Sequence, residues 1–158
     1  MKAIFAGSFD PITNGHLDII KRASKLFDKL YIGVLVNPNK KSFFDLEERK
    51  DLIIKSTKEI KNIEVISFEG LLVNFCKQND ISVLVRAIRS GQDIDYEIQM
   101  ANMNKELSKD IETIILTTNA RYNFVSSSLV KEVLYFGGEI KNLVPPIVLS
   151  ELKKKYKS

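Results

Sequence analysis

The chain has 158 residues, one cysteine and a formal net charge of +4 at neutral pH. Hydrophobic residues make up 44% and charged residues 28%, which is typical of a globular protein and not of a disordered or membrane-embedded one. No apolar run approaches the roughly 18 residues of a membrane span, the start is too short for a signal-peptide core, and one cysteine cannot form an internal disulfide. We therefore expect one cytoplasmic domain over residues 1–158.

Short apolar runs rich in β-branched residues alternate with amphipathic stretches along the chain. These runs predict five strands, over residues 3–6, 30–36, 63–68, 82–87 and 112–118. Helices are predicted between them, beginning near residue 15, near residue 46, within 70–80, within 92–107 and after the serines at 126–128. Near-continuous apolar strands suit a sheet covered on both faces, and the alternation indicates parallel strands with right-handed crossovers. We predict an α/β fold, a Rossmann-like parallel five-stranded sheet with helices on both faces.

The predicted helix at 92–107 has two apolar stripes. One contains Tyr96, Met100, Met103 and Leu107, and the other contains Ile94, Ile98 and Ala101. A surface helix needs only one apolar face, so this pattern predicts burial on two sides. Either the helix is sandwiched inside the monomer, or one face forms a subunit interface. A polar strip between the stripes, Asp93, Glu97 and Asn104, could face a cleft.

The stretch GSFDPITNGH, residues 7–16, follows the first predicted strand and contains the only histidine. In a parallel α/β sheet, ligands bind outside the carboxyl ends of the strands. Gly7 allows close approach of a ligand, and Thr13 or Asn14 can cap a helix that begins near Gly15. His16 then lies in the first helical turn, where free amides and the helix dipole favour a phosphate. The dipole disfavours a protonated imidazole and a bound phosphate favours it, so the charge of His16 stays open.

Other groups that bind anions follow other predicted strands. Lys40 and Lys41 follow the second strand, and Arg86 and Arg89 flank the end of the fourth. Arg86 lies within the apolar run VLVRAI, so it must be paired or directed at a ligand. Ser126, Ser127 and Ser128, after the fifth strand, can cap a helix and offer hydroxyls and amides. Four strand ends with phosphate-binding chemistry predict one site at the carboxyl edge.

Several common sites are missing from the sequence. It has no G-x-x-x-x-G-K-[ST] loop and no G-x-G-x-x-G motif. One histidine and one cysteine cannot build a zinc site. No nucleophile other than Ser8 is identifiable near His16. The tail KKKYKS, residues 153–158, contains four lysines, and the rest of the chain has 20 basic and 20 acidic residues. Because the excess charge is confined to the tail, we expect a solvated terminus and no nucleic-acid-binding face.

GSFDPITNGH, with its ending TNGH, resembles the first signature of the nucleotidyltransferase superfamily, and FVSSSLVKE resembles the second. With NPNKK, RAIRSGQDIDYE and MANMNKEL between them, the whole chain is most similar to the phosphopantetheine adenylyltransferase family. Nicotinamide-nucleotide and cytidylyl relatives usually have histidine where Thr13 stands. The resemblance implies adenylyl transfer from ATP to 4′-phosphopantetheine, which gives dephospho-coenzyme A and pyrophosphate in the penultimate step of coenzyme A synthesis. It also implies a homohexamer and Mg²⁺ held mainly by the ATP phosphates.

The resemblance also implies site residues, with the catalytic roles on His16, Lys40 and Arg89. Ser8 and His16 would contact the reacting phosphates, Lys40 and Arg86 the phosphopantetheine phosphate, and the Leu72 backbone the pantetheine arm. ATP would be held by Ser8 and His16 together with a further set: Phe9, Ala87, Ile88, Arg89, Glu97, Tyr122, Asn123, Phe124, Val125, Ser126, Ser127 and Ser128. No protein group is expected to bind a metal.

The sequence departs from the usual family pattern at four positions, which are Ser8 for threonine, Gly70 for aspartate, Ala87 for glycine and Tyr122 for tryptophan. None of these changes removes a charged catalytic group. Three alternatives stay open: a non-catalytic nucleotide-binding module, an RNA-associated protein held by the basic tail, and an enzyme with a different phosphate acceptor.

Overall fold

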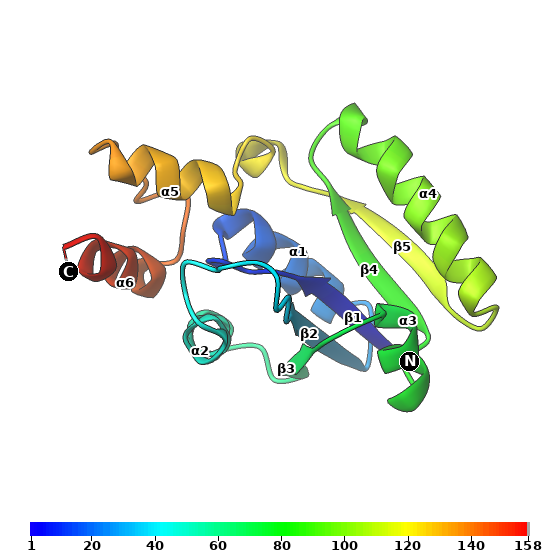
Figure 1. Ribbon diagram of the computed structural model, residues 1–158. Coiled ribbons are helices and arrows are strands. Elements are labelled where there is room, and N and C mark those ends of the chain that lie inside the picture. Colours follow the sequence, from blue (N-terminus) through cyan, green and yellow to red (C-terminus); the bar gives the residue numbers. More distant parts are fainter. Residues whose placement is uncertain (158) are drawn as a thin grey trace.

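The computed structural model describes residues 1–157, and its elements follow the predicted alternation (Figure 1). In chain order they are β1 (Lys2–Gly7), α1 (Asn14–Ser24), β2 (Lys29–Leu35), α2 (Leu46–Ser56), β3 (Ile63–Phe68), α3 (Leu72–Gln78), β4 (Val83–Ile88), α4 (Gly91–Leu107), β5 (Glu112–Thr117), the 3-10 turn η1 (Ala120–Tyr122), α5 (Ser127–Tyr135) and α6 (Pro146–Lys157). All five predicted strands are confirmed, each within one residue of its predicted ends.

The strands form one parallel sheet in the order β3-β2-β1-β4-β5. β1 lies at the centre, with Phe5 in register with Ile32 on one side and with Val85 on the other. From β1 the chain builds outward through β2 and β3, then crosses back to add β4 and β5 on the other side. This is the order of a Rossmann-like sheet, in which the direction of winding changes between β1 and β4.

Two apolar clusters cover the two faces of the sheet, which confirms the prediction of helices on both sides. Alternate residues of β1 point to opposite faces: Ala3 and Phe5 join the larger cluster, and Ile4 and Ala6 join the smaller one. The larger cluster contains buried residues of α1, α2, α5 and α6, and the smaller contains buried residues of α3. In Figure 1, α5 and α6 lie together at one end of the molecule, with α6 beside α2.

Helix α4 decides against one of the two interpretations of its apolar stripes. It lies along β4 and β5 at the edge of the molecule (Figure 1), and its one buried residue is Glu97. Tyr96 and Met103 of one stripe are 59% and 57% exposed, and Ile98 of the other is 46% exposed. A helix sandwiched inside the monomer is therefore wrong. The physical reason is that β5 is an edge strand, and no second layer of the described chain packs over α4.

The C-terminal tail continues helix α6, and Lys153, Lys154 and Lys157 are exposed as expected for a solvated terminus, whereas Lys155 and Tyr156 are half-buried. Val148 and Leu152 of this helix are fully buried, and the ammonium group of Lys155 lies 2.7 Å from a Glu48 carboxylate oxygen. The Tyr156 hydroxyl donates to the Lys131 carbonyl at 3.0 Å. Ser158, the last residue of the tail, lies outside the described residues. No helix within residues 1–157 is both long enough and apolar enough to cross a membrane.

Candidate active site

A cavity of about 310 Å³ opens at the carboxyl ends of β1 and β4, where the winding of the sheet reverses. Its lining comes from β1 and the turn after it, the amino end of α1, the end of β4, the first half of α4, and the segments after β5 and before α5. The predicted site residues that line it are Phe9, His16, Arg86, Ala87, Arg89, Glu97, Val125, Ser126 and Ser127. Asp93 of the polar strip lines it too, whereas Asn104 does not.

The amino end of α1 fixes the orientation of His16. Thr13 is the N-cap, and its hydroxyl accepts a hydrogen bond from the His16 amide at 3.3 Å. In return, the Thr13 amide donates to Nδ1 of the imidazole at 3.0 Å, which completes a capping box in which histidine takes the third position. Because Nδ1 accepts this bond, the proton of the neutral ring is on Nε2. His16 therefore presents an N–H donor on the side away from the cap.

The surroundings of His16 favour its neutral form. Burial of the ring, followed by the nearby positive charge of Arg89, lowers the pKa of His16 from 6.5 to about 4. The Phe9 ring lies with its centroid 5.0 Å from the imidazole centroid, and Phe9 reaches that place with a positive φ of 47°. The charge that the sequence left open is thus settled for the ligand-free protein. At neutral pH His16 is an uncharged donor.

Two arginines in this cavity are held by carboxylates from α4. Arg86 makes a bidentate pair with Glu97, at 2.8 Å from Nε and 2.9 Å from Nη2, and its Nη1 donates to the Ala6 carbonyl at 3.3 Å. Three of its five guanidinium N–H groups are used, and two remain for a ligand. Asp93 accepts a hydrogen bond from the Arg89 amide at 2.8 Å and lies 3.8 Å from its Nε. The expectation that Arg86 must be paired is confirmed, and its partner is Glu97.

A second cavity, of about 290 Å³, adjoins the first, because Ser126 and Ser127 line both. It contains Ser8, Lys40 and Ser128 of the predicted set, together with Lys41. Four cationic side chains and one carboxylate, that of Asp10, line this space, which makes it strongly positive. The cations are Lys40, Lys41, Arg49 and Lys131.

The serine turn offers its amides more than its hydroxyls. The Ser126 hydroxyl caps α5 by accepting from the Leu129 amide at 3.1 Å, and the Ser127 hydroxyl donates to the Pro11 carbonyl at 2.7 Å. Both hydroxyls are therefore engaged inside the protein. Ser127 and Ser128 are the first residues of α5 and line the second cavity, and amides in the first turn of a helix lack helical partners and favour negative charge.

The structure does not bring every predicted residue to these cavities. Tyr122 lines a separate cavity beside α1, together with Arg121. Leu72 packs on the smaller apolar cluster, and Phe124 is 57% exposed. Like Leu72 and Phe124, the predicted residues Ile88 and Asn123 line none of the three cavities.

Three charged residues of the second cavity were not predicted: Asp10, Arg49 and Lys131. Asp10 and Lys131 belong to the two quoted signatures, so their position was a usable signal. Arg49 is 7% exposed, and its guanidinium donates hydrogen bonds to the backbone carbonyls of Ser8 and Leu35. Nothing local in the sequence marks such a residue, because its contacts are with distant segments.

No group of three or more histidine, cysteine, aspartate or glutamate side chains that could hold a metal is found among the described residues. The carboxylates nearest the first cavity, Asp93 and Glu97, are engaged by Arg89 and Arg86. The donor set therefore does not fit a metal ion bound by the protein alone.

Residues 4–133 match the family profile described as cytidylyltransferase-like. The chain is 54% identical over 153 residues to a phosphopantetheine adenylyltransferase of Clostridium tetani, covering 97% of this chain and 96% of that protein. It is 53% identical over 157 residues to one of Streptomyces coelicolor, covering 99% and 98%. A Plasmodium falciparum nicotinic acid mononucleotide adenylyltransferase, solved as a complex with NaAD, has a similar fold, with a TM-score of 0.72 at 15% identity over 99% of this chain and 97% of that one.

Proposed function

Because this chain belongs to the phosphopantetheine adenylyltransferase family, it transfers the adenylyl group of ATP to 4′-phosphopantetheine, and we propose that it does so by in-line attack without a general base. The products are dephospho-coenzyme A and pyrophosphate, in the pathway to coenzyme A. The observation that supports this mechanism is the neutral His16, whose Nδ1 accepts a hydrogen bond from the Thr13 amide, so that its Nε2 carries the proton and is available as a hydrogen-bond donor.

The reaction needs no proton acceptor, because the nucleophile is a phosphate oxygen that is already anionic at neutral pH. That oxygen forms a bond to the α-phosphorus of ATP while the bond to the pyrophosphate oxygen breaks, so charge develops around the α-phosphorus. We assign the Nε2–H of His16 to an α-phosphate oxygen, where a preorganised donor stabilises the transition state. A neutral imidazole keeps its Nε2 proton and donates a hydrogen bond through it during the whole reaction.

The cations have separate tasks in this proposal. Lys40 bridges the attacking phosphate and the α-phosphate, and Arg89 with the amides before α5 binds the β- and γ-phosphates. Arg86 lines the first cavity and Lys40 the second, so an acceptor phosphate that both contact lies near the wall that Ser126 and Ser127 share. The two unused N–H groups of Arg86 are sufficient for this contact without release of Glu97.

Mg²⁺ has no cage of protein ligands among the described residues, so we propose that ATP phosphates supply most of its ligands. When bound, the ion neutralises phosphate charge. Every other contribution described here comes from residues of the chain itself.

We also propose a homo-oligomer, a hexamer in line with the family resemblance, that works in the cytoplasm. Support for the assembly is the two exposed apolar stripes of α4, which a second copy would bury. Support for the compartment is the single cysteine, Cys76, which is buried and free. Two of the four lysines of α6 pair with carboxylates, Lys155 with Glu48 and Lys154 with Glu151, which favours a structural helix over an RNA-binding tail.

The function is tested by measuring pyrophosphate release with ATP and 4′-phosphopantetheine, against nicotinamide mononucleotide and glycerol 3-phosphate as rival acceptors. We expect release with 4′-phosphopantetheine only. Preference for another acceptor would contradict the substrate assignment, and no release with any acceptor would favour a non-catalytic nucleotide-binding module.

The role of His16 is tested by His16→Ala in the same assay. Loss of one preorganised donor typically costs about 10²- to 10³-fold, so kcat should fall by that factor, or roughly 3–4 kcal/mol of transition-state stabilisation. His16→Gln is the matched control for the folded state, since its amide can still donate in the direction of the cavity, and it should retain more activity. A folded His16→Ala protein with near wild-type turnover would overturn the assignment.

A further inference from the structure

Lys40 lies in the segment between β2 and α2, residues 36–45, which we call the Lys40 loop. This loop has no helix or strand, and Lys40 itself is exposed. Within the loop, the Lys40 amide donates to the Asn37 carbonyl at 3.2 Å, and the Asn39 amide donates to the Asn37 side chain at 3.0 Å. These are local turns, so the position of the Lys40 amine relative to the α-phosphate depends on where the loop is attached to the rest of the protein.

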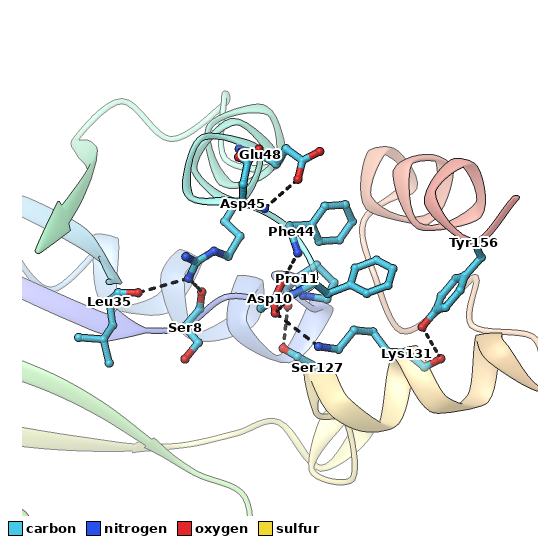
Figure 2. A network of polar contacts seen from close by, with 12 residues as sticks. Ser8, Asp10, Pro11, Leu35, Phe44, Asp45, Glu48, Ser127, Lys131 and Tyr156 are labelled. Atoms are coloured by element: carbon cyan, nitrogen blue, oxygen red, sulfur yellow. Dashed lines mark hydrogen bonds and ion pairs between the residues drawn. The ribbon is translucent and has the colours of Figure 1, made fainter. Parts of the chain in front are cut away.

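The attachment at the far end of the loop is the carboxylate of Asp10. One oxygen accepts a hydrogen bond from the Phe43 amide at 2.7 Å, and the other accepts from the Phe44 amide at 2.8 Å (Figure 2). Asp10 is 9% exposed, and Lys131 is its cationic neighbour at 3.5 Å. A buried carboxylate that accepts two amides in good geometry forms a strong, directional contact. Asp10 thereby joins the turn after β1 to the end of the Lys40 loop.

Other contacts brace the same end of the loop. Phe44 is 2% exposed, its ring faces the ammonium of Lys155 at 5.0 Å, and the Phe43 ring lies 5.0 Å from that of Tyr156. The guanidinium of Arg49 donates to the Ser8 carbonyl at 2.9 Å, which ties α2 to the turn after β1 that contains Asp10. In Figure 2 the Asp10 carboxylate lies at the centre of these contacts, between the α2 segment, α5 and α6.

We propose that Asp10 is a positioning residue that places Lys40 against the reacting phosphates by holding the Lys40 loop through the Phe43 and Phe44 amides. Asp10 lines the second cavity, yet both of its carboxylate oxygens are engaged by protein groups, so it acts through the loop. This inference rests on the proposed role of Lys40. A misplacement of about 1 Å can cost about 10²-fold in rate, which sets the scale of the effect.

The test is a double-mutant cycle on the full chain with Asp10→Asn, Lys40→Ala and both together, measured by pyrophosphate release. Asparagine keeps the size of the side chain but replaces one carboxylate oxygen by an NH₂ donor. In the place of Oδ2, that donor would oppose the donors of the Phe43 amide and Lys131. We expect kcat/KM for 4′-phosphopantetheine to fall about 10- to 100-fold while KM for ATP stays within about twofold. In the Lys40→Ala background, Asp10→Asn should cost less than about threefold.

The matched control is Asp110→Asn, which makes the same chemical change at an exposed turn before β5 and should leave both substrates unaffected. Two results would overturn the proposal: effects of Asp10→Asn and Lys40→Ala that multiply in full in the double variant, or a rise in KM for ATP as large as that for 4′-phosphopantetheine. A wild-type protein that releases no pyrophosphate would instead refute the reaction itself, so the two failures are distinguishable.

Amide hydrogen exchange on the wild type decides the matter if Asp10→Asn does not fold. The proposal requires the Phe43 and Phe44 amides to be protected about tenfold or more over those of Lys41 and Ser42. Equal exchange at all four amides would mean that Asp10 does not hold the loop, and would overturn the proposal.

Discussion

His16 takes part in two structures at once, the capping box of α1 and the wall of the first cavity. The bond from the Thr13 amide to Nδ1 assigns the ring proton to Nε2, and burial with Arg89 keeps the ring neutral. The sequence was sufficient to place His16 in the first helical turn, because cap residues and a glycine preceded it. Its protonation could not be predicted, because it depends on enclosure by Phe9 and on Arg89, which is far away in the chain.

We expect the single histidine to titrate in the folded protein with a pKa of about 4 and not at 6.5. The unfolded chain then binds the proton more readily than the folded one, so the folded state loses stability as the pH falls from 6.5 to 4. The full linkage is worth about 3 kcal/mol at pH values below both pKa values and vanishes above pH 6.5. An NMR titration of the imidazole Cε1 proton measures this pKa, and a midpoint of 6 or above would contradict a buried neutral ring.

The elements that were predicted well are those whose pattern is local. Five strands covered on both faces are near-continuous apolar runs, so their limits could be read from the sequence within one residue. Helix α6 was missed because its four lysines indicated a solvated tail, while its apolar positions Val148 and Leu152 are few. Burial of these side chains against the larger cluster, together with the Lys155–Glu48 pair, decides the structure there.

Helix α6 should contribute strongly to stability. Leu152→Ala removes a fully buried side chain and leaves a cavity between α6 and the core, which typically costs about 2–5 kcal/mol. Lys153→Ala, at the next and exposed position, should change the free energy of unfolding by less than about 0.5 kcal/mol. Urea unfolding followed by circular dichroism compares the two variants. Equal stability of both would show that α6 is not part of the cooperative core.

At the scale of the whole molecule, α4 leaves its apolar stripes exposed in the monomer. Two apolar stripes were readable from the sequence, but what covers them was not, because a helix inside a domain and a helix between subunits have the same pattern. The structure excludes the first of these, since Met100, Met103 and Leu107 are all more than a third exposed. The face that carries Glu97 is turned to the cavity, so the apolar stripes are available for another copy of the chain.

We expect the wild type to be an oligomer and Met103→Glu to weaken it, because a carboxylate at a position that is 57% exposed in the monomer would be desolvated in an apolar interface. Light scattering measures the mass of both proteins at the same concentration. Lys109→Glu, in the exposed turn after α4, introduces the same side chain outside the stripes and is the control. A monomeric wild type would contradict the proposed assembly.

The low proton affinity of His16 has a consequence for the cell. A change of pH between about 6 and 8 leaves this donor unchanged, because its pKa of about 4 lies well below that range. The phosphate group of the acceptor, however, is converted from a dianion to a monoanion as the pH falls through about 6. Acidification would therefore slow the supply of coenzyme A through the ionisation of the metabolite, and the histidine would play no part as a sensor.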